Sequence, residues 1–521
     1  MKDKKNFLLI LICVAIVASP LFRSEVFGGS EVLFNVARIK SISEGSFWLY
    51  PTWLYDFGEP VGFMYPWLFM TIPALFLRLG MPIELVINGF SALIILFAAI
   101  SAYFAGKIFF KSEKLATIFS ICYIAQWYFQ LTLFFRVDLG EALAQIFIPL
   151  AFASSISLLK NFETKNYLRY VAIFAYTGLI QSHTPTAAVF FAVLILILLV
   201  NRKNVDSKNV KFVLISTLGI NIFFLVPMTY FYLTLDLAIK DPAWNERFDT
   251  INFAFVVDVL RSIYFLAVPL FIYTGYKIFK HDVEEFQKRI FLGGIIISIV
   301  CIVAVSLLPM NEFSLRLMAV FTISMAAAMM ISVSRLEKFS YPVLVILALY
   351  SVTFGGNLGS GNPEAYLGWR FVDTVEFRYE LTNAVFRPSG KTFPRIDSVF
   401  DGFSYANAHA DDLRLWRAYW THRSDKNEMP ILYFEGYHAF DRDGDEIDIG
   451  PSPRNLVRLS HTTARGVTLV YEMLLGFKIA IVISILSLII VCYKGVTDLV
   501  NNAGKNSGAG SEENRDSGAV F

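Results

Sequence analysis

Long apolar stretches alternate with short polar connections along this chain of 521 residues. A helix that crosses the hydrocarbon of a membrane needs roughly 20 apolar residues. Twelve stretches approach that length, near residues 7–22, 84–105, 114–130, 139–158, 168–181, 185–200, 211–234, 253–277, 290–308, 312–333, 340–355 and 472–493. The pattern predicts an all-α polytopic membrane protein with about 12 transmembrane helices.

Basic residues are concentrated in alternate connections between these spans. They lie in residues 107–114, 160–169, 201–211, 277–289, 335–338 and from 494 onward. By the positive-inside rule, all six connections become cytoplasmic. The first span follows Lys2, Lys4 and Lys5, and because no convincing cleavage site comes after it, we expect an uncleaved anchor. Both termini are therefore expected in the cytoplasm, and the protein in the cytoplasmic membrane.

Two long segments then face the extracytoplasmic side, residues 23–83 and 356–471. The first contains a short apolar run, Pro66–Leu79, whose length and two prolines suit a helix in the outer interface better than a crossing. The second contains short alternating or β-rich runs separated by turn residues, which predicts a small β-containing domain before the last helix. These runs are residues 394–400, 431–440, 446–449, 456–459 and 467–471. The predicted transmembrane core is residues 1–355.

The predicted chain ends with a last transmembrane helix, residues 472–493, and a tail, residues 494–521. The tail is rich in Gly, Ser, Asn and charge, so it has too little apolar surface to offset the entropy of ordering. We expect it to be disordered in the cytoplasm.

Composition excludes two large classes of protein. With 56% hydrophobic residues and a mean hydropathy of +0.55, the chain lies outside the range of soluble proteins. A net charge of +2 without a dense basic stripe argues against a nucleic-acid partner. All four cysteines lie inside predicted spans without metal-type spacing, so no disulfide framework is expected.

Ionisable residues gather at the outer ends of the predicted spans. Glu31 follows the first span, where partial loss of hydration could prepare a carboxylate for general-base catalysis; a solvated loop glutamate is the alternative. Asp138 and Glu141 stand three residues apart where a span begins. On a helix they share a face, and they suit either a carboxylate pair that binds a divalent cation or a capping box.

Two further candidates rest on single residues. His183 lies in a tight outer turn, where it could bind phosphate, shuttle a proton or simply bond the backbone. Arg316 lies about one turn inside an apolar helix, where binding of an anion competes with a simple intrahelical pair to Glu312. The acidic run Asp441–Asp445 fails the EF-hand pattern and is expected to be a hairpin turn.

Several of these segments together resemble the GT-C superfamily of integral-membrane glycosyltransferases, and within it the YfhO-like, or 6-pyruvoyl-tetrahydropterin synthase-related, bacterial membrane proteins. The resemblance is carried by short motifs in Glu31–Ile39 with the aromatic loop to Tyr65 and Pro66, in Gly140–Leu150, Ser182–Thr186, Phe313–Arg316 and Leu432–Tyr437, and at Asp443 and Gly444. The resemblance implies a GT-C-like helical core whose active face is extracytoplasmic.

The resemblance further implies an inverting enzyme that moves a sugar from a polyprenyl-phosphate donor to a lipid or glycan acceptor. Glu31 would deprotonate the acceptor hydroxyl, and a divalent cation is a possible cofactor. The other candidates would bind substrate: Arg38, Arg136 and Arg316 the lipid phosphate, His183 phosphate, Asp138 and Glu141 the acceptor or a divalent ion, and Trp48, Trp53 and Tyr65 sugar faces or the membrane interface.

A second class of function competes with this one. The chain could be a lipid-linked glycan polymerase, or a transporter or assembly protein without transferase activity. Few ionisable residues lie at mid-span, where transport sites usually sit, and this disfavours transport. A polymerase would need similar residues on its outer face, so the sequence leaves that alternative open.

Overall fold

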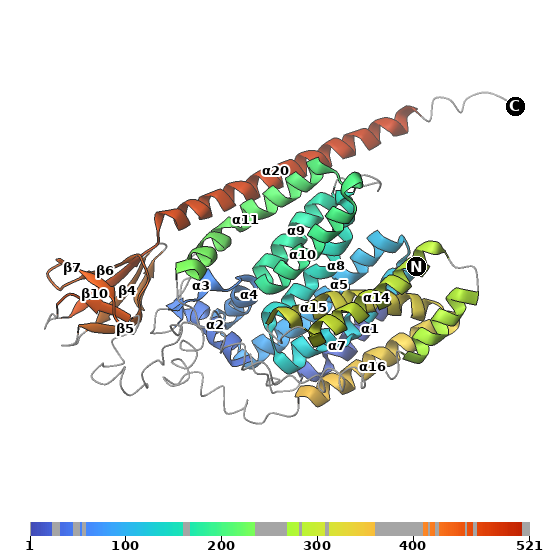
Figure 1. Ribbon diagram of the computed structural model, residues 1–521, viewed down its shortest axis with the longest axis horizontal. Helices are drawn as coiled ribbons and strands as arrows, with labels where there is room; N and C mark the ends of the chain where they lie inside the picture. The colour runs from blue at the N-terminus through green and yellow to red at the C-terminus, as the bar shows by residue number, and fades with distance from the viewer. Residues whose placement is uncertain are drawn as a thin grey trace.

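The protein is mostly helical, with a small β region beside the start of its last helix (Figure 1). The computed structural model describes residues 2–22, 32–44, 53–54, 59–159, 167–234, 268–280, 284–307, 312–359, 410–414, 417–422, 427–453, 456–461 and 466–512. The start of the first helix and the end of the last lie at one end of the bundle, and the β-strands lie at the other (Figure 1).

Helices occupy the stretches that the apolar pattern predicted. Their bounds are α1 Lys2–Ala18, α5 Ile83–Phe110, α6 Glu113–Ala125, α8 Leu139–Ser155, α9 Leu168–Ser182, α10 Thr184–Val200, α11 Ser207–Thr234, α14 Glu285–Leu307, α15 Glu312–Ser334, α16 Ser340–Gly359 and α20 Leu475–Glu512. Among the described residues, six segments are long and apolar enough to cross a membrane: Lys4–Phe22, Ile83–Phe110, Ser207–Thr234, Gln287–Ala304, Leu317–Ser334 and Leu475–Asn501. A count of twelve crossings stays a prediction, and most of the predicted span 253–277 lies outside the described residues.

Small and hydroxylated residues join the central helices. Ala98 and Ala102, four residues apart on α5, are completely buried. Ser120 of α6 donates a hydrogen bond to the carbonyl of Ala99 at 2.6 Å, and the hydroxyl of Ser101 donates to the carbonyl of Ile146 on α8. Without a hydrophobic driving force between helices in lipid, close backbone approach and interhelical hydrogen bonds are what hold such a bundle together.

The predicted first outer segment contributes three helices to the end of the bundle nearer the β-strands (Figure 1): α2 Val32–Glu44, α3 Val61–Met64 and α4 Leu68–Arg78. The short apolar run is therefore helical, as predicted, and α4 buries Phe69 and Met70 while leaving Leu75 exposed. Its place in the membrane interface stays a prediction.

The predicted β region is confirmed. Its strands are β3 Ala410–Arg414, β4 Arg417–His422, β5 Glu428–Leu432, β6 Tyr437–Phe440, β7 Glu446–Ile447, β8 Ile449–Pro451, β9 Leu456–Leu459 and β10 Val467–Glu472. They form two antiparallel sheets, in the orders β3-β4-β10-β6-β7 and β5-β9-β8. Strand β10 buries Val467, Leu469 and Tyr471 at alternate positions, which is the period of a strand with one face in a core.

An aromatic cluster fixes the β region to the bundle. The ring of Phe231 on α11 lies 5.3 Å from that of Phe63 on α3 and 5.4 Å from that of Phe434, between centroids. Phe477 of α20 lies 5.1 Å from Phe63. These separations suit edge-to-face and tilted aromatic contacts. The cluster therefore joins α3, α11 and α20 to the β region.

Helix α20 corrects the prediction for the end of the chain. It begins at Leu475, since β10 occupies the residues before it, and continues to Glu512. Residues 494–512 are thus helical where disorder was predicted, and residues 513–521 lie outside the described part. A formed helix extends at little cost, and the carboxylate of Asp498 is bonded by Arg169 and Tyr170 of α9.

Candidate functional site

The candidate site forms at the first turn of α8. Asp138 precedes this helix, and its Oδ1 accepts a hydrogen bond from the backbone N–H of Glu141 at 3.0 Å. The predicted capping by Asp138 is therefore confirmed. A full capping box would also need the Glu141 side chain to accept from the N–H of Asp138, and this part of the alternative is wrong. That N–H donates to the carbonyl of Thr132 at 3.0 Å, and the Glu141 carboxylate accepts from Arg136.

A π-helical turn, Leu131–Arg136, leads into this cap. The turn ends at Val137, whose backbone is left-handed with a φ of 53°. A β-branched side chain rarely adopts this conformation, and π-turns are frequent at functional sites. The sharp change of direction at Val137 lets the residues on both sides of it, Arg136 and Asp138, reach the start of α8.

Arg136 pairs with both carboxylates. Its Nη1 lies 2.7 Å from Oε2 of Glu141, and its Nη2 lies 3.3 Å from Oδ2 of Asp138. The Tyr128 hydroxyl donates to Oε1 of Glu141. The side chain of Glu141 is 0% exposed, and a carboxylate so buried requires a charged partner and hydrogen bonds. Arg136 and Tyr128 supply them.

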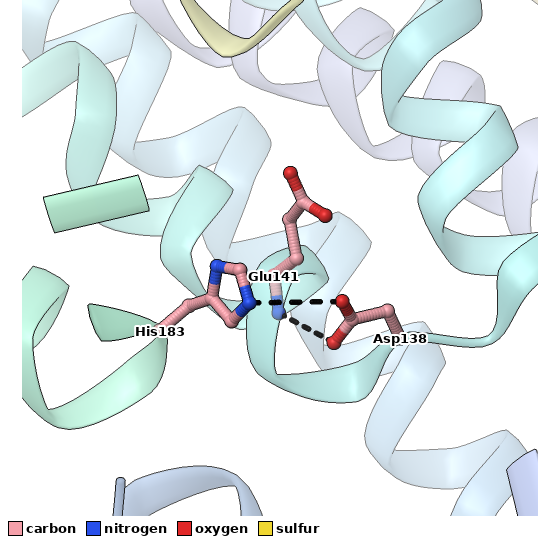
Figure 2. A group of neighbouring side chains, drawn as sticks. All are labelled: Asp138, Glu141 and His183. Carbon is pink, nitrogen blue, oxygen red and sulfur yellow. Dashed lines mark hydrogen bonds and ion pairs between the residues drawn. The ribbon is translucent and has the colours of Figure 1, made fainter. Parts of the chain in front are cut away.

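His183 joins the site from the turn between α9 and α10. Its Nε2 faces Asp138 across the start of α8 and lies 3.8 Å from Oδ2 of that residue (Figure 2). Its Nδ1 forms a 2.7 Å hydrogen bond with the Thr186 hydroxyl. A bond at one ring nitrogen fixes the orientation of an imidazole and so prepares the other nitrogen for a ligand or a proton.

Because glycine has no side chain, Gly140 allows α8 and α9 to approach each other closely. A Cβ at residue 140 would lie 3.0 Å from the carbonyl oxygen of Ser182 and 3.2 Å from Cδ1 of Phe69. Contacts this short would push one of these neighbours back. Gly140 therefore allows the end of α9, and with it His183, to approach the cap of α8.

Asp138, Glu141 and His183 together suit a divalent cation. Each offers one ligand atom, and these atoms lie within 4.8 Å of one another. Carboxylate oxygens and an imidazole nitrogen are ligands that Mg²⁺, Mn²⁺ and Zn²⁺ accept. Two carboxylates and one guanidinium leave a formal charge of about −1 while His183 is neutral, so the group can accept a cation or a proton.

Helix α2 also contacts this site. Asn35 is buried, and its Nδ2 donates to the carbonyl of Val137 at 2.8 Å. Arg38, three residues later on the same face of α2, is also buried and lies over the ring of Tyr65, 3.5 Å from Cζ to centroid. Arg38 and Tyr65 are thus brought together, and Arg38 covers one face of the ring that was predicted to stack on a sugar.

Four further predicted residues remain. Glu31 and Trp48 fall outside the described residues. Trp53 is in β1, Trp53–Leu54, which pairs with β2, Glu59–Pro60, and Arg316 is in α15. The structure describes the backbone of these two residues and not their side chains. The roles of these four residues, including that of Glu31 as base, stay predictions.

Four residues that build the site were missed in the sequence. Thr186 and Gly140 had a local signal, since one follows His183 by three positions within its turn and the other separates the two carboxylates. Tyr128 and Asn35 reach the site from other elements. No local pattern marks such long-range partners.

Comparison with known proteins shows distant similarities. No family model matches it. A protein of Lactococcus lactis subsp. cremoris, described as uncharacterized, is 24% identical over an alignment of 250 residues that covers 43% of this chain and only 39% of that protein. The crystal structure of the apo oligosaccharyltransferase of Archaeoglobus fulgidus aligns with a TM-score of 0.45 and 12% identity, over 75% of this chain and 61% of that one. Similarity at this level assigns the chain to no family.

Proposed function

We propose that the chain is a membrane glycosyltransferase that moves a sugar from a polyprenyl-phosphate donor to a lipid or glycan acceptor on the outer face of the cytoplasmic membrane. The observation that carries the proposal is the convergence of Arg136, Asp138, Glu141 and His183 within a bundle of membrane-length helices. Ionisable groups in such surroundings are costly and mark functional sites by default. The resemblance to the GT-C superfamily and its YfhO-like branch supports the same reading.

The proposed reaction is a single displacement at the anomeric carbon. The acceptor oxygen forms the new bond to that carbon, the bond to the lipid phosphate breaks, and the bonding electrons leave with the phosphate. Glu31 takes the proton of the acceptor hydroxyl. Inversion follows because attack and departure occur on opposite faces of the sugar.

The charged residues of the site have distinct proposed tasks. Asp138, Glu141 and His183 would hold a divalent cation, which when bound would neutralise charge on the lipid phosphate. The side chain of Arg136 is 13% exposed, and its guanidinium would face an anion while it remains close to Glu141. Arg38 and Arg316 are proposed as further phosphate ligands. Trp48, Trp53 and Tyr65 would contact the sugar or the interface.

The test compares surface glycans, by mass spectrometry, between a deletion strain and strains complemented at matched membrane levels. The complementing proteins are wild type, Glu31→Gln, Asp138→Asn and, as control, Glu113→Gln, which removes an exposed carboxylate paired with Lys107. We expect one sugar substituent to disappear on deletion and to return with wild type and the control only.

Two results would overturn parts of this proposal. If Glu31→Gln restores the substituent as well as wild type does, Glu31 is not the base. If deletion changes the length of a glycan chain, or blocks its export, the protein acts as a polymerase or a transporter instead.

A further inference from the structure

Val137 has a backbone conformation that is unfavourable for a β-branched side chain. Among the described residues, three other than glycine have a positive φ: Lys111, Val137 and Glu337. Val137 alone of these is β-branched, and its φ of 53° and ψ of 40° lie in the left-handed region. Such a residue persists there only when its surroundings hold it.

The residue that reaches across to hold Val137 is Asn35. Its amide donates to the Val137 carbonyl at 2.8 Å, across 102 positions of sequence. Both residues are buried, with 4% of Asn35 and 2% of Val137 exposed. A buried carbonyl that loses its donor costs free energy. The Asn35 bond therefore favours the left-handed backbone at Val137.

The conformation of Val137 determines where its two neighbours point. Arg136, on one side, reaches Oε2 of Glu141 at 2.7 Å, and Asp138, on the other, accepts from the N–H of Glu141 at 3.0 Å. If Val137 returned to an ordinary backbone, Arg136 and Asp138 would no longer both face Glu141. The geometry of the ion pairs thus depends on a bond made by α2.

We propose that Asn35 is a positioning residue of the site: its bond to the Val137 carbonyl holds Arg136, Asp138, Glu141 and His183 in their common arrangement. The proposal rests on the proposed function, because it assumes that this arrangement acts on a ligand. Asn35 follows Glu31, the proposed base, by four positions. Helix α2, which begins at the residue after the proposed base, would therefore set the geometry of the acidic site.

The test compares four full-length proteins, purified in detergent: wild type, Asn35→Asp, Val137→Gly and the double variant, with Asp138→Asn and Asn201→Asp as two control proteins. Ionised aspartate has the shape of asparagine but no donor, and glycine adopts the left-handed conformation without strain. Mn²⁺ is the probe, and electron paramagnetic resonance measures its binding. Asp138→Asn tests whether the bound Mn²⁺ is at this site. Asn201→Asp is the matched control, since the side-chain amide of Asn201 donates a hydrogen bond of the same length, 2.8 Å, to the Ile197 carbonyl.

We expect Asn35→Asp to weaken Mn²⁺ binding about tenfold, and Val137→Gly to restore most of that loss in the double variant. The Asn201→Asp control should bind as wild type does. Mn²⁺ binding is measured below the thermal unfolding transition of every variant, so that a residue that merely stabilised the fold would leave the binding unchanged. Equal binding by wild type and Asn35→Asp, or a double variant as weak as Asn35→Asp, would overturn the proposal.

Failure of the proposed function is distinguishable from failure of this inference. If the four proteins behave as expected toward Mn²⁺ but deletion of the gene changes no glycan, the positioning role stands and the transferase does not. If wild type binds no Mn²⁺, the four proteins are compared in the glycan assay. Asn35 then has no role at the site if Asn35→Asp complements the deletion as well as wild type does. The same conclusion follows if the deletion changes no glycan.

Discussion

Two acidic groups of this protein are alike in sequence and different in the structure. Asp138 and Glu141 are buried beside Arg136 and His183. The run Asp441–Asp445 forms an exposed hairpin turn between β6 and β7, as predicted. In that turn, Oδ1 of Asp441 accepts the backbone N–H groups of Asp443 and Asp445, both at 2.9 Å.

The difference shows what turns carboxylates into a candidate site. In the hairpin, the Asp441 carboxylate is used by the backbone of its own turn, which is the usual role of aspartate in turns. At the start of α8, one oxygen of Asp138 caps the helix, and its other oxygen faces groups from a different turn. A ligand site therefore depends on partners that arrive from elsewhere, and not on the density of acidic residues.

The largest expected effect comes from Glu141→Gln. This change leaves the Arg136 guanidinium without its closest carboxylate, 2.7 Å away, in a buried setting. We expect the free energy of unfolding to fall by about 3 kcal/mol, and sugar transfer to fall at least ~100-fold. Thermal unfolding in detergent and the glycan assay measure the two. Asp445→Asn in the exposed turn is the control, and equal effects of the two changes would contradict the comparison.

Gly140→Ala should have the next largest effect. Its methyl group would meet the Ser182 carbonyl at 3.0 Å and so move His183 away from Asp138. Because sub-ångström misplacement of catalytic groups is costly, we expect transfer to fall ~30-fold. Gly89→Ala on α5 is the control, because its Cβ meets no atom within 4 Å. Loss of activity in the control to the same extent would show that the approach of α8 and α9 is not the cause.

Thr186→Val should have a smaller effect. It removes the 2.7 Å partner of Nδ1 of His183 while keeping the shape of the side chain. The ring then loses its fixed orientation, and we expect Mn²⁺ affinity to fall ~10-fold. Thr322→Val is the control, since the Thr322 hydroxyl bonds the Met318 carbonyl of its own helix at 2.7 Å. Unchanged Mn²⁺ affinity in Thr186→Val would argue against His183 as a ligand.

The smallest effect on activity is expected for Asp441→Ala. The turn would lose an acceptor for two backbone N–H groups, which destabilises the β region by about 1 kcal/mol. Transfer and Mn²⁺ binding should stay at the wild-type level. Limited proteolysis between β6 and β7 measures the local opening. A fall in Mn²⁺ binding would mean that the Asp441–Asp445 turn also contributes to cation binding, which would contradict the comparison.

Sequence patterns predicted most of the fold because the relevant signals are local. Apolar stretches gave helix positions within a few residues for α5, α8 and α11, and β9 begins and ends where its alternating run does. Strands β3 and β4 were not predicted. The helical end of α20 was also missed, because its composition favours disorder and only contacts such as Asp498 with Arg169 and Tyr170 of α9 bring it against the bundle.

By itself, the sequence determined that this is a helical chain with membrane-length apolar segments, and it offered helix capping as one of two alternatives for Asp138. Those properties depend on residues within a few positions of each other. Only the tertiary structure decided that His183 meets Asp138, that Tyr128 bonds Glu141, and that Asn35 holds Val137. Such contacts join elements far apart in the chain, and they form because packing of the helices, and not local backbone preference, sets the distances between them.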